Sequence, residues 1–162
     1  MKTYITIFML AILSSCSVEE IPDQGLIIEC TVSADISNDW DRANEIVTEI
    51  NSYRESINLS AFRTNKGIAV DLGLEHNVYM MDRQRISHDN FQQRARILSQ
   101  QGAQSVGENV AFGYNNGAEV VNAWINSQEH RDVLEGNYTD ASVAVTKDIY
   151  GVLYITLLVT RL

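Results

Sequence analysis

Two histidines and one glutamate lie in segments whose residue types and spacing point to chemistry. His88 lies in SHDNF, His130 in SQEHRDVL and Glu108 in SVGENVAFGY. If the last segment forms a β-strand, Glu108 shares a face with Val106 and Val110, because the side chains of a strand alternate. A carboxylate in such an apolar row is rarely buried without a partner, and imidazole can both satisfy a carboxylate and bind a metal. The histidines are therefore candidate partners of Glu108.

The same three side chains suit two different arrangements. Two imidazoles and a carboxylate with an open position form the ligand set of some catalytic zinc centres. His88, Glu108 and His130 are therefore candidate ligands for Zn²⁺ or another divalent cation, and candidate catalytic residues. They equally suit a hydrogen-bonded network in which Glu108 orients a histidine and no metal is bound. Ser87 and Ser127 lie near the histidines, but no Ser-His-Asp order is recognisable, so no nucleophile is predicted.

The third histidine, His76, lies in a different sequence context from the other two. His76 lies at helical spacing from Leu72, Tyr79 and Met80. A histidine within such an apolar stripe is usually a hydrogen-bonded core residue. We therefore predict that His76 belongs to the core of a helix.

The sequence predicts four helices and three strands, which would position these groups. Asp39 is a candidate N-cap for a helix whose apolar face carries Ile46, Val47, Ile50, Tyr53 and Ile57. A second helix is expected from about 67 to 85, a shorter one over 90–102, and a fourth after Asn116 that carries Trp124 and ends near His130. Strands are expected over 105–114, 141–147 and 151–162, the last two forming a hairpin. Helices mixed with strands in this order predict an α+β or layered α/β/α domain.

These segments together resemble a known family. SHDNF, SVGENVAFG and VVNAWINSQEHRDV, with INSYRESINLSAFRTN upstream, resemble the compact bacterial branch of the CAP superfamily, also called the SCP domain of cysteine-rich secretory proteins. The likeness runs from about residue 40 to 162. It implies a three-layer α-β-α sandwich with a small, mainly antiparallel central sheet and a cleft that holds two histidines and two acids. On this resemblance His88 and His130 match the histidines, and Glu108 matches the glutamate of Gly-Glu-Asn.

The sequence departs from the family pattern at the second acid. Ser127 stands at that position, and the neighbouring Glu129 is a candidate substitute. The resemblance therefore places Ser127, Glu129 and Asn109 around the cleft rather than as its main ligands. Ser142 and Ala144 stand where the family favours glycines, a change expected to affect close packing more than the cleft.

The N-terminal segment predicts export and anchoring. A basic Lys2, an apolar run over 4–13 too short to span a bilayer, and small residues after it are typical of a signal peptide. LSSC resembles a bacterial lipobox, which implies cleavage before Cys16 and its lipidation; a plain secretory signal is the alternative. We thus expect a signal peptide over 1–15, an acidic tether over 16–38 and the domain over 39–162. Cys30 would then have no disulfide partner, and we expect it to be a small buried apolar residue.

The net charge and the predicted lipid anchor limit the classes of function that the sequence suggests. A formal net charge of -9 argues against nucleic-acid binding. CSVEE resembles a signal that places lipoproteins on the outer face of the outer membrane; a soluble spacer is the alternative. We expect a monomeric lipoprotein of the bacterial cell envelope, anchored in the outer membrane on its periplasmic or its outer face. The resemblance favours a non-enzymatic module that binds a lipid or an envelope or extracellular protein. The alternatives are a metal-dependent hydrolase of peptide or ester bonds, or a purely structural His/Glu set.

Overall fold

The computed structural model describes residues 37–64 and 67–162. The expected signal peptide, Cys16, Cys30 and nearly all of the tether lie outside these residues. The described residues belong to one compact unit, Ser33–Leu162. Within them, no helix has the length and apolar character that a membrane span needs.

A four-stranded sheet with the order β1-β3-β4-β2 forms the centre of the domain. Its strands are β1 (Arg63–Thr64), β2 (Ser105–Phe112), β3 (Asp140–Lys147) and β4 (Leu153–Arg161). β4 pairs antiparallel with both β2 and β3, whereas β1 runs parallel to β3. The predicted hairpin of β3 and β4 is confirmed, and β2 is an edge strand. The two-residue β1 was not predicted, because it is too short to show any periodicity.

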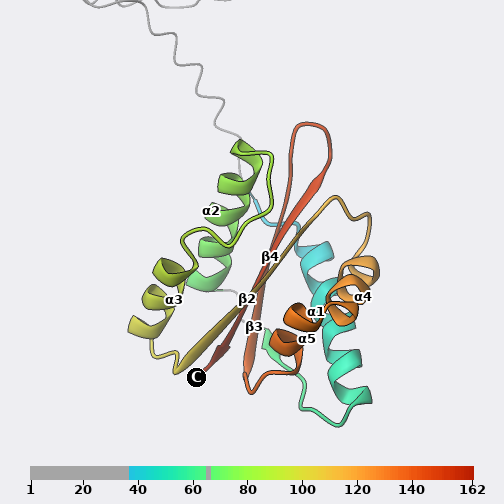
Figure 1. Cartoon of the computed structure of the whole chain (residues 1–162), viewed down its shortest axis with the longest axis vertical. Helices are drawn as coiled ribbons and strands as arrows, with labels where there is room; N and C mark the ends of the chain where they lie inside the picture. Colours follow the sequence, from blue (N-terminus) through green and yellow to red (C-terminus); the bar gives the residue numbers. More distant parts are fainter. Residues whose placement is uncertain (1–36, 65–66) are drawn as a thin grey trace, which may run out of the picture. The chain divides into compact units, whose positions relative to one another are not determined.

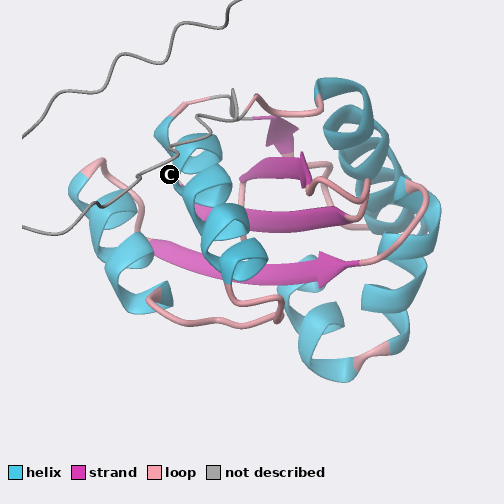
Figure 2. Ribbon diagram, turned by 90° about the horizontal axis from the view of Figure 1, so that it is seen from above, coloured by secondary structure: helices cyan, strands magenta, loops and turns pink. Residues whose placement is uncertain are grey.

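Helices cover both faces of this sheet (Figures 1 and 2). α2 (Ile68–Asp82) and α3 (Phe91–Gln100) lie on one face, while α1 (Trp40–Ser56), α4 (Gly117–Asn126) and α5 (Gln128–Glu135) lie on the other. The larger core packs α1 and α4 against the sheet through fully buried side chains such as Ile46, Ile50 and Val120. The predicted three-layer α-β-α fold is confirmed.

The N-cap predicted at Asp39 is present, and Asn116 caps the start of α4. The Asp39 side chain accepts a hydrogen bond from the Arg42 backbone N–H, and Asn116 accepts one from that of Glu119. The predicted core position of His76 is also correct, since only 3% of this residue is exposed. Ile57, expected on the apolar face, is instead the C-cap of α1 and lies exposed.

The predicted helix that carries Trp124 and ends near His130 is two helices. α4 ends at Asn126, and Ser127 adopts an extended backbone (φ -103°, ψ 121°) before α5 begins. Neither glycine nor proline marks this break, so the helical pattern alone could not locate it. Its consequence is that His130 lies in the first turn of a separate helix, with its own direction.

Candidate functional site

Glu108 is held on the α2/α3 face of the edge strand β2. The apolar neighbours on that face, Val106 and Val110, pack against α2 and α3 as the alternation predicted. The glutamate side chain between them is only 1% exposed. An ionised carboxylate at this depth needs strong donors.

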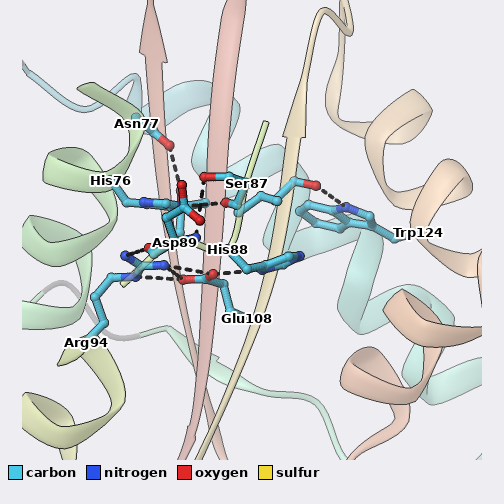
Figure 3. Close-up of polar contacts among 10 residues, drawn as sticks. His76, Asn77, Ser87, His88, Asp89, Arg94, Glu108 and Trp124 are labelled. Carbon is cyan, nitrogen blue, oxygen red and sulfur yellow. Dashed lines mark hydrogen bonds and ion pairs between the residues drawn. The ribbon is translucent and has the colours of Figure 1, made fainter. Parts of the chain in front are cut away.

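Arg94 of α3 provides most of these donors. Its Nε donates to Glu108 Oε2 at 2.7 Å and its Nη2 donates to Oε1 at 2.9 Å, a two-point ion pair (Figure 3). The Arg94 side chain is itself 7% exposed, and its Nη1 donates to the backbone carbonyl of Asp89 at 2.9 Å. Arg94 therefore fixes both the carboxylate and the loop that leads into α3.

His88 is the second hydrogen-bond partner of the Glu108 carboxylate. Its Nδ1 lies 2.9 Å from Glu108 Oε1. Because a carboxylate only accepts, this contact places a proton on Nδ1 and leaves Nε2 directed away from Glu108. The His88 side chain is 53% exposed, so one edge of the ring is buried against Glu108 while the rest faces solvent.

The loop that carries His88 is held from its other side. His76 Nε2 lies 2.7 Å from the Ser87 carbonyl oxygen, and Tyr79 donates its hydroxyl proton to Asp89 at 2.8 Å. Burial lowers the pKa of His76, so its ring is neutral near pH 7 and donates to Ser87. The predicted core histidine thus serves the site indirectly, by positioning the residue that precedes His88.

His130 approaches the site from the opposite helical layer. A 2.7 Å hydrogen bond joins its Nδ1 to Ser127 Oγ, and Asn109 donates from Nδ2 to the His130 carbonyl at 3.0 Å. Burial lowers the pKa of His130, and electrostatic repulsion between the His88 and His130 rings when both are protonated lowers it further. The two rings are thus close enough to interact electrostatically, but His130 makes no hydrogen bond to Glu108.

The other predicted site residues differ in whether they contact His130. Ser127 and Asn109 do. Glu129 is exposed, and it acts on His130 only by its charge, which opposes the lowering of the pKa. In the described part of the chain, no group of three or more His, Cys, Asp or Glu side chains is arranged to hold a metal ion.

A pocket of about 280 Å³ opens beside His130 at the free edge of β2. Trp124 forms one wall, is buried, and donates its indole N–H to the Val110 carbonyl at 3.2 Å (Figure 3). The lining is mainly apolar and aromatic, with Ser127 and His130 as its polar corner; it comprises Ile86, Val110, Ala111, Phe112, Tyr114, Ala123, Trp124, Ser127 and His130. Such a pocket suits an apolar or aromatic group that carries one hydrogen-bonding atom.

These contacts assign different tasks to the three predicted ligands. Both carboxylate oxygens of Glu108 are already engaged by Arg94 and His88. The Nδ1 atoms of His88 and His130 are bonded to oxygen atoms, and within residues 37–64 and 67–162 no hydrogen bond reaches either Nε2. The two imidazoles therefore fit a metal as outward-facing donors, with Glu108 as the group that orients His88.

Arg94 is the site residue that we did not predict. Its position in the sequence contains a usable signal, because it lies three residues after Phe91 and four before Leu98, on the apolar face of its helix. A charged residue on the apolar face of a helix needs a buried counter-charge. Glu108, the acid in an apolar row of β2, is the residue that supplies it.

The comparisons with known proteins agree with this fold. The family model described as "Cysteine-rich secretory protein family" (CAP) matches residues 47–158. An extracellular protein containing an SCP domain from Bacillus anthracis has a similar structure, with a TM-score of 0.65 and 25% identity, over 75% of this chain and 41% of that one. An outer surface protein from Borrelia burgdorferi matches with a TM-score of 0.62 and 21% identity, over 72% of this chain and 89% of that one.

A cysteine-rich secretory protein from Staphylococcus aureus has the same fold, with a TM-score of 0.62 and 17% identity, over 78% of this chain and 40% of that one. The chain thus spans about two fifths of the Bacillus and Staphylococcus proteins. No curated protein matched the sequence.

Proposed function

The chain belongs to the CAP family of cysteine-rich secretory proteins, and we propose that it is a cell-envelope lipoprotein that binds an apolar ligand. The ligand is a lipid or the apolar side chain of an envelope or extracellular protein. The observation that carries this proposal is the aromatic pocket beside His130, next to polar groups that are already bonded to one another. A site with its carboxylate neutralised by Arg94 is suited to holding a ligand rather than to moving protons.

Location and anchoring form part of this proposal. The similar structures include an outer surface protein and an extracellular protein of other bacteria. Together with the signal sequence, this supports a place in the envelope or outside the cell. Lipidation of Cys16 would hold the domain at the membrane on the acidic tether, and the domain would act as a monomer.

Filling the pocket tests the binding function. Ala123 lines the pocket on α4, so Ala123→Trp should occupy the space that a ligand needs. We expect this change to weaken binding of N-phenyl-1-naphthylamine, a neutral aromatic probe, on the order of tenfold or more, measured by fluorescence titration. Ala118→Trp, at an exposed position of the same helix, is the matched control. Equal probe affinity in both variants would place the ligand elsewhere.

A metal-dependent hydrolase is the second candidate. It is favoured by the two imidazoles, each with its Nδ1 held by an oxygen and its Nε2 free. A divalent cation bound by His88 and His130 would act as a Lewis acid and lower the pKa of a bound water. The residues of the chain would orient the two rings through Glu108 and Ser127.

The two functions differ in their response to loss of His88. A hydrolase should lose roughly a hundredfold or more of its zinc-dependent turnover of 4-nitrophenyl acetate in His88→Ala. A binding module should show no zinc-dependent turnover above buffer, and its probe affinity should be nearly unchanged by the same substitution. Zinc-dependent turnover that disappears in His88→Ala would therefore replace the binding proposal with the hydrolase.

A further inference from the structure

Two large apolar side chains lie exposed at the tip of the β3–β4 hairpin. Ile149 is 91% exposed and Tyr150 is 77% exposed, more than any other large apolar residue in the described ranges. Figure 1 shows this hairpin projecting beyond the sheet at the upper end of the view. Polar residues usually occupy such positions, so the tip presents apolar surface that the domain itself does not cover.

The turn that presents these side chains is firmly built. Asp148 Oδ1 accepts hydrogen bonds from the backbone N–H groups of Tyr150 at 2.9 Å and Val152 at 2.8 Å. The backbone of Asp148 also pairs with Val152 and Gly151, and Gly151 adopts φ +82°, which favours glycine. The exposure of Ile149 and Tyr150 is thus a property of a defined turn.

Further exposed apolar side chains lie at the same end of the sheet. Phe112, at the end of β2, pairs in register with Tyr154 near the start of β4 and is 43% exposed. Ile86 follows α2, whose last turns pack against Tyr154 through Met80, and is 39% exposed. Both side chains also line the ligand pocket, so the hairpin end and the pocket share apolar residues.

The described chain enters the domain at this same end. Asn38 donates to the Val143 carbonyl and accepts from the Val145 N–H, and Asp39 forms an ion pair with Lys147 at 3.2 Å. Lys147 is the last paired residue of β3 before the hairpin. A chain anchored upstream therefore joins the domain close to its exposed apolar tip.

We propose that the β3–β4 hairpin end, with Ile149 and Tyr150 at its tip, inserts into the surface of the lipid bilayer that carries the anchor. This inference rests on the proposed lipidation of Cys16. Cys16 precedes Ser37 by 21 residues, a chain that can extend at most about 75 Å. The anchor would thus keep the tip near lipid at all times, so that a weak second contact is enough to orient the domain.

Insertion would be driven by apolar burial rather than by charge. The chain carries a formal net charge of -9, which opposes attraction to anionic lipid. An isoleucine next to a tyrosine suits the boundary between acyl chains and headgroups, because the tyrosine hydroxyl can remain hydrated. The pocket-lining residues Phe112 and Ile86 would then face the bilayer, where an apolar ligand would be available.

Lipid quenching of a tryptophan placed at the tip tests this inference. The full acylated chain is reconstituted into vesicles of phosphatidylethanolamine and phosphatidylglycerol, with part of the lipid brominated at shallow acyl positions. Ile149→Trp is compared with Ile57→Trp, an exposed site at the far end of α1, and the signal of the wild-type tryptophans is subtracted. We expect the Ile149→Trp emission to shift to shorter wavelength and to be quenched at least twofold more than that of Ile57→Trp.

Three results would overturn the inference. Quenching could be absent at both sites, or equal at both, which would mean no contact or no preferred orientation. A blue shift at Ile149→Trp without quenching would mean that the tip is covered by a second copy of the chain. Vesicle flotation of the wild type and Cys16→Ala tests the anchor separately. If only the anchor fails, an N-terminal hexahistidine tag on nickel-chelating vesicles replaces it, and the same quenching outcomes decide.

Discussion

At the scale of single residues, the ion pair of Glu108 and Arg94 determines the character of the site. Both side chains are almost completely buried, whereas His88 is about half exposed. The buried partner of Glu108, which we had expected to be a histidine, is thus chiefly an arginine. Removal of either charge would leave the other buried and uncompensated.

We expect Arg94→Ala and Glu108→Ala each to lower the free energy of unfolding by about 3–5 kcal/mol, because a stranded buried charge is strongly destabilising. His88→Ala should lower it by no more than about 1 kcal/mol, since half of the His88 side chain is exposed and Arg94 still donates to both oxygens of Glu108. Urea denaturation of the three variants measures these differences. The double variant Arg94→Met, Glu108→Leu should be more stable than either alanine variant. Equal losses for His88→Ala and Arg94→Ala would contradict this assignment.

The pKa of His76 predicts a dependence of stability on pH. Burial lowers this pKa in the folded chain below the ordinary value of 6.5, so the unfolded chain binds a proton more readily as the pH falls. The contribution of His76 to the free energy of unfolding is then fully present above about pH 6.5 and declines as the pH falls below it. We expect the urea midpoint to fall between pH 7 and 5.5, and to fall less in His76→Gln, which retains a donor for Ser87. An unchanged slope in His76→Gln would show that His76 protonates as freely in the folded chain as in the unfolded one.

At the scale of elements, the contact of α2 with the sheet depends on Gly73. A Cβ atom at this position would lie 2.7 Å from the Cβ of Ala144 on β3. Ala144 stands where the family resemblance led us to expect glycine, so the small residue in this contact is supplied by the helix instead. The replacement of the family's glycine by Ala144 on β3 is thus compensated by Gly73 on α2, which packs against it.

Gly73→Ala should therefore destabilise the domain by about 1–3 kcal/mol, despite the higher helix propensity of alanine. The double variant Gly73→Ala, Ala144→Gly should recover most of this loss, because it restores the space on the other side of the contact. Thermal unfolding of the single and double variants measures the coupling. Additive losses in the double variant would mean that the two residues do not share this contact.

The elements also show what could be predicted from the sequence and why the rest could not. Periodicity located α1 by its apolar stripe and β2 by its alternation, and the hairpin was found as two apolar strands, buried along nearly their whole length, on either side of a turn. It missed the break at Ser127, where no glycine or proline interrupts the pattern. It also missed the partner of Glu108, because an arginine on a helix is usually solvated and the pairing joins residues 14 apart through the fold.

At the scale of the whole molecule, the ligand pocket and the exposed hairpin lie at the end of the domain where the described chain begins. The proposed anchor, tip and pocket would then act on one membrane surface, which makes a membrane-derived apolar molecule the expected ligand. We propose that the pocket lined by Trp124 and His130 binds such a molecule without chemistry.

Native mass spectrometry of the full chain extracted from the cell envelope measures whether this pocket is occupied. We predict that the wild type and Ala118→Trp carry the same bound molecule and that Ala123→Trp does not, because only the last substitution fills the pocket. A ligand retained in Ala123→Trp, or none in the wild type under conditions that preserve the fold, would contradict the claim.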